Sequence, residues 1–446
     1  MKVAYYVGAF PCLSETFIQR EVAALYRSGL ALRVFAHRAL DRELLQPMGL
    51  ELLQKTTYLP LHGGVVRGLL RQLRRRPART LHSLCYFWTF RRALLMPGQS
   101  KRDLLVRSLL LAEALEESGV THLHSPWAFN DAVVALLAAK LLRIPYSVQA
   151  RASDLYSHKS LNSLDQKLIQ AAFIVTNADY NVRTIEERFT GRKSPPIHCV
   201  YEGLEVRTLE PVAPREGPLE TARLLCVARI TEPKGIIHLL QAANLLKRSG
   251  WSFRCDIIGS VPASEPGYAE EVRRLHADLG LAEEVRFLGA QPFDRVLERY
   301  RWADLCLLAA VEASDGRRDV TPNTLIEALS MGVPVVSTRS GAIPEVVDDG
   351  ETGLLAPPAD PEAFAAAIMS LLDDDALRCR MAARARIVAE SRFDIEENIC
   401  TYLKLFQWQG TGNGDANTAD ARSAAGDLAH DSSQAERFAA QFSDDR

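Results

Sequence analysis

At residues 319–336 the sequence reads Asp319-Val320-Thr321-Pro322-Asn323-Thr324-Leu325-Ile326-Glu327-Ala328-Leu329-Ser330-Met331-Gly332-Val333-Pro334-Val335-Val336. This pattern predicts a helix capped by Thr321 and opened by Pro322, a glycine stop and a short apolar strand. The amides of Asn323, Thr324 and Leu325 then face outward at the positive end of the helix dipole, where a phosphate binds well. Glu327 lies one turn inside the helix, within reach of ligand hydroxyl groups, and Asp319 lies before the cap. The alternative is a capped core helix with two incidental acids.

The composition describes an ordinary soluble protein that is too long for one hydrophobic core. The chain has 446 residues, 47% of them hydrophobic and 24% charged, and a formal net charge of −2. Two domains are therefore expected, and the charge gives no general argument for nucleic acid. No apolar run is long enough to span a bilayer, and the N-terminus lacks the features of a signal peptide. The eight cysteines are scattered without a CxxC pair, which fits a reducing cytoplasm and disfavours a metal site or a disulfide framework.

Short apolar runs alternate with helical patterns along most of the chain, as in parallel sheets that are covered by helices. The first series of predicted strands lies at 3–7, 32–35, 121–124, 146–149, 173–176 and 197–201. The second lies at 223–228, 254–258, 285–288, 304–308 and 333–336. The expected fold class is therefore α/β, with two Rossmann-like doubly wound domains facing across a cleft at the carboxyl ends of their strands.

The domain boundaries follow from composition. A proline-bearing stretch at 209–218 is the expected linker between an N-terminal domain, 1–208, and a C-terminal domain, 219–391. An amphipathic helix at 392–409 is expected to pack back on the N-terminal domain. Residues 410–446 are rich in Ala, Asp, Ser and Gly and are expected to be a disordered tail.

Several segments together resemble the family 4 glycosyltransferases, which are retaining sugar-nucleotide enzymes of the GT-B fold. The segment at 226–235 is similar to the family's strand end, where Arg229 and Lys234 match the arginine and lysine that clamp the donor diphosphate. The segment at 285–289 resembles the strand that approaches the base, and 340–347 with 349–355 resembles the phosphate-side loop and turn. Gly259 is a further donor-binding candidate. The resemblance runs to about Gln407.

The resemblance also implies roles for the two acids of the opening stretch. In the family's E-x7-E motif, the second acid holds the ribose hydroxyls, and Glu327 matches it. The first acid approaches the donor sugar, and here the position is Asp319, one methylene shorter. Independently of the family, a leaving diphosphate needs fixed cations, and Arg229 and Lys234 follow a strand end on a short loop. A surface salt-bridged pair is the alternative for these two residues.

Three N-terminal segments carry the remaining site candidates. Ser14 is expected to cap a helix and to present Glu15 and Thr16 on the acceptor side, although simple capping explains the same pattern. His124 ends another predicted strand and is expected to line the cleft. Arg151 stands where the family commonly has a histidine that contacts the transferred sugar. An arginine stays charged near neutral pH, so it cannot shuttle protons but can bind a sugar or a phosphate.

Basic and aromatic residues alternate between Arg67 and Arg102, with no acidic residue among the basic ones. Such helices suit an anionic membrane surface, and lipid-linked acceptors favour that interpretation. A helical hairpin with solvated arginines is the alternative. Nucleic acid is disfavoured, because no nucleic-acid-binding motif accompanies the region.

The resemblance implies a cytoplasmic, peripherally membrane-associated glycosyltransferase. It would move a sugar from a nucleotide-diphosphate donor to a growing glycan, through a lipid-linked exopolysaccharide or other cell-surface polysaccharide precursor, with retention. No cofactor and no metal are expected, since arginine and lysine supply the positive charge. One alternative is a non-catalytic nucleotide- or glycan-binding partner within a biosynthetic complex, as the departures at Arg151 and Asp319 suggest. A GT-B epimerase is a third, weaker possibility.

Overall fold

The computed structural model describes residues 1–12, 15–40, 45, 47–59, 65–89, 100–156, 163–263 and 265–408. Within these residues, seven parallel strands form one sheet and six parallel strands form another. The predicted α/β fold with two doubly wound sheets is therefore confirmed. The predicted disordered tail, 410–446, lies outside the described residues, as does Ser14.

The first sheet has the strand order β3-β2-β1-β4-β5-β6-β7, so the order in which strands are added to the sheet reverses between β1 and its parallel neighbour β4. Its strands are β1 (Lys2–Tyr6), β2 (Ala31–Ala36), β3 (Thr56–Tyr58), β4 (His122–Ser125), β5 (Tyr146–Gln149), β6 (Ile174–Thr176) and β7 (Ile197–Cys199). Its helices are α1 (Thr16–Arg27), α2 (Pro47–Lys55), α3 (Val65–Arg75), α4 (Pro77–Thr89), α5 (Lys101–Ser118), α6 (Asn130–Leu142), α7 (Ser153–Tyr156), α8 (Leu164–Leu168) and α9 (Asp179–Arg188). Strand β3, an edge strand of three residues, was not predicted from the sequence.

The second sheet has the order β10-β9-β8-β11-β12-β13. Its strands are β8 (Ala222–Val227), β9 (Phe253–Ile258), β10 (Val285–Gly289), β11 (Leu305–Leu308), β12 (Val335–Thr338) and β13 (Gly353–Ala356). Its helices are α10 (Ile236–Arg248), α11 (Pro266–Asp278), α12 (Phe293–Trp302), α13 (Asn323–Ser330), α14 (Ile343–Val346), α15 (Pro361–Asp373) and α16 (Asp375–Arg392), and α17 (Ile395–Trp408) follows. Short 3-10 helices are η4 (Val206–Thr208) and η5 (Glu232–Lys234). The turn expected at 349–355 is corrected in part, because residues 353–355 belong to strand β13.

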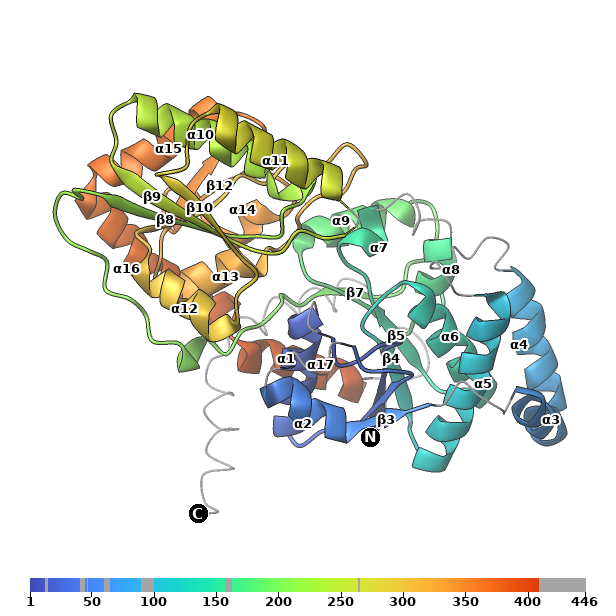
Figure 1. Ribbon diagram of the computed structural model, residues 1–446. Helices are drawn as coiled ribbons and strands as arrows, with labels where there is room; N and C mark the ends of the chain where they lie inside the picture. The colour runs from blue at the N-terminus through green and yellow to red at the C-terminus, as the bar shows by residue number, and fades with distance from the viewer. Residues whose placement is uncertain are drawn as a thin grey trace, which may run out of the picture. The chain divides into compact units, whose positions relative to one another are not determined.

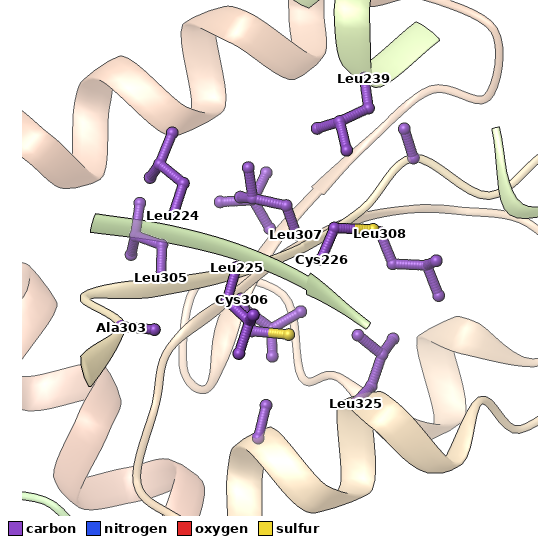
Figure 2. Close-up of a cluster of buried hydrophobic side chains, with 14 of the residues drawn as sticks. Leu224, Leu225, Cys226, Leu239, Ala303, Leu305, Cys306, Leu307, Leu308 and Leu325 are labelled. Atoms are coloured by element: carbon purple, nitrogen blue, oxygen red, sulfur yellow. The ribbon is translucent and has the colours of Figure 1, made fainter. Parts of the chain in front are cut away.

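Apolar central strands build the core of the second sheet. In β8 and β11, Leu225 pairs with Cys306, and both are fully buried. Strands that are buried on both faces read as continuous apolar runs, because helices cover both sides of a parallel sheet. Figure 2 shows Leu239 of α10 on one face of these strands and Leu325 of α13 on the other. Figure 1 shows α10, α11 and α15 on one side of β8–β10, and α12 and α13 on the other.

The last described helix, α17, contributes to the core of the first sheet. Phe406 is fully buried and lies with its ring centroid 5.3 Å from that of His122 and 6.0 Å from that of Phe173. Ile399 and Tyr402 belong to the same buried cluster as Val3 of β1. Between the two sheets, residues 209–218 form neither helix nor strand.

Hydrogen bonds also connect the two halves of the chain. The Glu345 carboxylate, from α14, accepts hydrogen bonds from the amides of Asp179 (2.7 Å) and Tyr180 (2.6 Å) at the start of α9. A carboxylate at a helix N-terminus satisfies free amides and favours the helix dipole. This contact fixes the segment at 340–347, which the family resemblance places on the phosphate side, against the first half of the chain.

Candidate functional site

The carboxyl end of β8 leads into a loop that carries Arg229 and Lys234. Arg229 is exposed, and the described residues give its guanidinium no ion pair or hydrogen bond. Gly259 makes this backbone arrangement possible, since a Cβ there would lie 1.9 Å from the carbonyl oxygen of Ala228. An unpaired, exposed arginine at a strand end is free to bind an anion in a bidentate manner.

Lys234 is paired with Asp319. Its ammonium lies 2.8 and 2.6 Å from the two carboxylate oxygens, and both side chains are largely buried. The backbone of Asp319 is in turn held close to the next loop, where a Cβ on Gly341 would lie 1.9 Å from the Asp319 carbonyl oxygen. Gly341 has φ +56°, a conformation that glycine adopts without steric cost. The first acid of the opening stretch is thus a counter-ion of Lys234 in this structure.

Helix α13 begins one residue later than expected. Pro322 occupies the N-cap position, and no side chain caps the helix, so the prediction that Thr321 is the cap is wrong. The Thr321 hydroxyl instead accepts a hydrogen bond from the Asn177 amide at 2.7 Å. The reason is local competition: a side-chain amide from the other half of the chain is within reach of the hydroxyl.

Two of the three predicted helix amides remain available. The Leu325 amide donates to the Pro322 carbonyl at 3.0 Å, so its predicted role as a free donor is corrected. For the amides of Asn323 and Thr324, no backbone or side-chain acceptor occurs in the described part of the chain. Their N–H groups lie at the positive end of the helix dipole, which favours an anion.

Glu327 is buried within α13 and bonded on two sides. The Tyr300 hydroxyl donates to its carboxylate at 3.2 Å and to the Thr324 carbonyl at 2.9 Å. The Arg20 guanidinium, from α1, lies 3.6 Å from the same carboxylate. Burial raises the pKa of Glu327, while Arg20 and Tyr300 act in the opposite direction. Sequence reasoning missed both partners, because nothing local marks an arginine of α1 or a tyrosine of α12 as a neighbour of Glu327.

Arg151 lies among internal partners. Its guanidinium donates to the Glu202 carboxylate (2.9 Å) and to the Gln149 side-chain oxygen (2.8 Å), and it stacks over Phe17 at 4.2 Å. Only 1% of the residue is exposed. Burial lowers the pKa of Arg151, but attraction to Glu202 and other acids outweighs it, so the pKa is raised. The guanidinium thus has internal partners in this structure, and a contact of Arg151 with the transferred sugar stays a prediction.

A chain of hydrogen bonds connects this cluster with α13. The Asn177 amide, which follows β6, donates to the Glu202 carboxylate at 2.9 Å as well as to the Thr321 hydroxyl. The hydrogen bonds from Arg151 through Glu202 and Asn177 therefore reach Thr321, two residues before the first residue of α13. Sequence reasoning missed Asn177 and Glu202, since neither belongs to a recognisable motif.

His124 does not line a cleft. Both His124 and His122 are fully buried, and each ring bonds the Ser147 hydroxyl, at 2.8 and 2.7 Å. Burial lowers the pKa of His122 to about 3 and that of His124 well below its ordinary value. Helix α17 covers the ring, as its 5.8 Å centroid distance to Phe406 shows, and the acceptor-side role of His124 stays a prediction.

The loop before α1 holds the remaining candidates. Glu15 occupies the N-cap position of α1 and Thr16 is its first residue, while the predicted cap, Ser14, lies outside the described residues. Glu15 and Thr16 are both half-buried. Burial raises the pKa of Glu15. Their acceptor-side role stays a prediction.

Two further observations concern metal binding and membrane spans. The described residues contain no group of three or more His, Cys, Asp or Glu side chains that could hold a metal ion. Every helix in the described ranges is too short or too polar to cross a bilayer.

Comparison with known proteins places this geometry in a family. The family "Glycosyl transferases group 1" matches residues 221–374, the part that holds Arg229, Lys234 and α13. The putative colanic acid biosynthesis glycosyltransferase WcaL of Escherichia coli is 25% identical over 410 residues, covering 88% of this chain and 96% of that protein. The amylovoran biosynthesis glycosyltransferase AmsK of Erwinia amylovora is 33% identical over 178 residues, which is 40% of this chain and 42% of that one.

Solved structures agree on the fold. A glycosyltransferase from Rickettsia africae superposes with a TM-score of 0.69 at 17% identity, covering 92% of this chain and 99% of that one. The HepE protein of Anabaena, solved in complex with UDP, superposes with a TM-score of 0.68 at 16% identity, covering 91% and 100%. These likenesses establish the GT-B fold. The chain belongs to the group 1, family 4 glycosyltransferases, and it is a nucleotide-sugar glycosyltransferase related to enzymes of exopolysaccharide biosynthesis.

Proposed function

We propose that the protein transfers a sugar from a nucleotide-diphosphate donor to a lipid-linked polysaccharide precursor, with retention at the anomeric carbon. In this proposal residues 219–391 bind the donor and residues 1–208 face the acceptor. The relatives named for colanic acid and amylovoran biosynthesis support this acceptor class.

The observation that carries the donor part is the state of Arg229. It is exposed and has no partner among the described residues, on a loop that also carries Lys234. When the bond between the sugar and the diphosphate breaks, negative charge develops on the diphosphate. Fixed cations and oriented amides stabilise such charge strongly in a site that excludes water.

The donor must compete with Asp319 for the Lys234 ammonium. Both carboxylate oxygens of Asp319 lie within 2.8 Å of the Lys234 ammonium. A diphosphate that binds the amides of Asn323 and Thr324 would share this ammonium, which leaves the Asp319 carboxylate beside the sugar. Glu327, held by Tyr300, would then accept hydrogen bonds from the ribose hydroxyls.

Membrane contact is the second part of the proposal. Helix α4 exposes Leu81 (56%) and Trp88 (70%), and α3 exposes Arg74 and Arg75. Apolar side chains beside arginines suit the interface of an anionic bilayer, where lipid-linked acceptors are found.

Donor chemistry is tested by the slow hydrolysis of sugar nucleotides by purified protein, using UDP-, GDP-, ADP- and dTDP-sugars, and by transfer to a membrane extract. The anomeric configuration of a transferred sugar, read by NMR, tests retention. Binding of a donor without hydrolysis or transfer would contradict the proposal.

A further inference from the structure

A cavity of about 620 Å³ lies apart from the donor residues. One wall is formed by Ile144, Pro145 and Tyr146, where β5 begins, and another by residues 170–172, just before β6. Parallel strands have their amino ends at one edge of the sheet and their carboxyl ends at the other. The cavity is therefore at the edge of the sheet opposite Arg151, which follows β5. It includes neither the buried cluster of Arg151, Glu202 and Asn177 nor the open N-terminus of α13.

The charges around this cavity have one sign. Its lining contains Arg79 and His82 of α4, Lys140 of α6 and Arg143, and no aspartate or glutamate. Arg79, His82 and Arg143 have no ion pair or hydrogen-bonded side-chain partner among the residues that the structure describes. A concave site with several unpaired cations favours an anionic ligand.

Lys140 is held without a carboxylate partner in the described ranges. Its ammonium donates to the Gln170 side-chain oxygen at 2.7 Å and lies 4.3 Å from the centre of the Tyr86 ring. Burial lowers the pKa of Lys140, which is the response of a cation that lacks a counter-ion. A phosphate in the cavity would supply that counter-ion.

Arg143 occupies an unusual backbone position. It ends α6 with φ +57°, in the left-handed region, where a residue other than glycine costs about 1 kcal/mol. Glycine would adopt this turn without that cost. The arginine therefore adds a charge at the cavity rim in place of the residue that the turn itself favours.

An exposed apolar line lies on the same helix as Arg79 and His82. Leu81, Cys85 and Trp88 are exposed, and their spacing of four and three residues places them on one face of α4. Leu81 is 56% and Trp88 70% exposed. Large apolar side chains gathered on a surface mark a contact with a membrane or another apolar partner.

From these features we propose that the cavity binds the phosphate headgroup of a membrane lipid, with Arg79, Lys140 and Arg143 around the phosphate and an acyl chain along Leu81 and Trp88. The proposal rests on the membrane contact proposed above and gives it a specific binding site. It does not depend on the donor chemistry. The same cations could take a soluble phosphate compound, so the experiment separates the two sources.

The test is co-sedimentation of the full-length protein with vesicles of phosphatidylcholine, with and without phosphatidylglycerol. We expect Arg79→Gln with Arg143→Gln to weaken binding to the anionic vesicles at least tenfold. The matched control, Arg248→Gln with Arg254→Gln in the second half of the chain, removes the same charge at two exposed positions that are not part of the proposed membrane contact, and it should weaken binding less than about threefold. Thermal unfolding by circular dichroism verifies that both pairs fold.

Equal losses in the two pairs would overturn the cavity site in favour of general electrostatic attraction, and unchanged binding in both would also overturn it. A third arm adds inorganic phosphate to the protein without vesicles. A contrary outcome is that millimolar phosphate raises the melting temperature of the wild type but not of the Arg79→Gln, Arg143→Gln variant, while these two substitutions leave vesicle binding unchanged. In that case the site binds soluble phosphate and the lipid proposal is wrong. Donor hydrolysis is measured without vesicles, so a failure here is distinguishable from a failure of the glycosyltransferase assignment.

Discussion

The carboxyl ends of both sheets collect charged and polar side chains, but these side chains are in different states. At the first sheet, Arg151 is 1% exposed and its guanidinium is bonded to Glu202 and Gln149. At the second sheet, Arg229 is exposed and has no partner in the described residues. A buried arginine that is paired with a carboxylate supports structure, whereas an exposed, unpaired one is available to a ligand. The difference supports the proposal that residues at the second sheet meet most of the donor charge.

The largest effect is expected at Arg151, the buried arginine of this comparison. Arg151→Met leaves the Glu202 carboxylate buried without its cation, which should lower the free energy of unfolding by about 3–5 kcal/mol. Urea denaturation followed by circular dichroism measures it. Adding Glu202→Gln removes the unpaired charge and should recover part of the loss. An unfolding free energy for Arg151→Met within 1 kcal/mol of the wild type would contradict a structural role.

On the open side, the expected loss is in turnover and not in stability. Arg229→Ala and Lys234→Ala should each reduce donor hydrolysis on the order of 10²- to 10³-fold, because each removes a fixed cation from the leaving diphosphate. Arg254→Ala is the matched control, since Arg254 is an exposed arginine near the amino end of β9. Melting temperatures close to that of the wild type would show that both site variants are folded. Near-normal hydrolysis in both variants would contradict the proposed contrast between Arg151 and the donor-site cations.

Acid should selectively destabilise the first sheet, where His122 is buried. Burial lowers the pKa of His122 to about 3, from an ordinary value of 6.5. The unfolded chain therefore binds the proton more readily, and stability is lost as the pH falls below 6.5, by about 2 kcal/mol between pH 7 and pH 5. In His122→Phe this part of the pH dependence should disappear, while the exposed His82→Gln should keep it. Parallel pH profiles for His122→Phe and the wild type would contradict the expectation.

The smallest effect concerns the residue that holds Glu327 in place. Tyr300→Phe removes hydrogen bonds to the Glu327 carboxylate and the Thr324 carbonyl, at a cost of about 1–2 kcal/mol in stability. The donor KM should rise severalfold while kcat changes little, since Tyr300 positions Glu327 and is buried away from the ligand. Tyr26→Phe, which loses a hydroxyl on the surface of α1, serves as the control. A change in kcat alone would argue against a positioning role.

Apolar periodicity was sufficient to predict most of the fold. It marked the central strands, such as β8 and β11, because they are buried on both faces and read as continuous apolar runs. It missed β3 and β13, which are edge strands of three and four residues. Segments this short carry too few alternations to show a period, and Gly353 at the start of β13 resembles a turn.

The candidate site was predictable only where function leaves a local pattern. Arg229 and Lys234 follow a strand end, and α13 carries its own start and stop signals, so each is visible in a short window. The burial of Arg151 and His124 depends on Glu202, Ser147 and α17, which are distant in sequence. Pairings of this kind, like that of Arg20 with Glu327, arise from packing and leave no local mark.

The central claim is that Arg229, Lys234 and the first amides of α13 bind a diphosphate. The most direct measurement is the thermal shift produced by UDP, GDP, ADP and dTDP, compared with that of the parent nucleosides, in the wild type and in the Arg229→Ala, Lys234→Ala double variant. A ligand that binds only the folded state raises the melting temperature. The account predicts that at least one diphosphate, but not its nucleoside, gives a clear shift that is lost in the double variant. An undiminished shift in the double variant would contradict it.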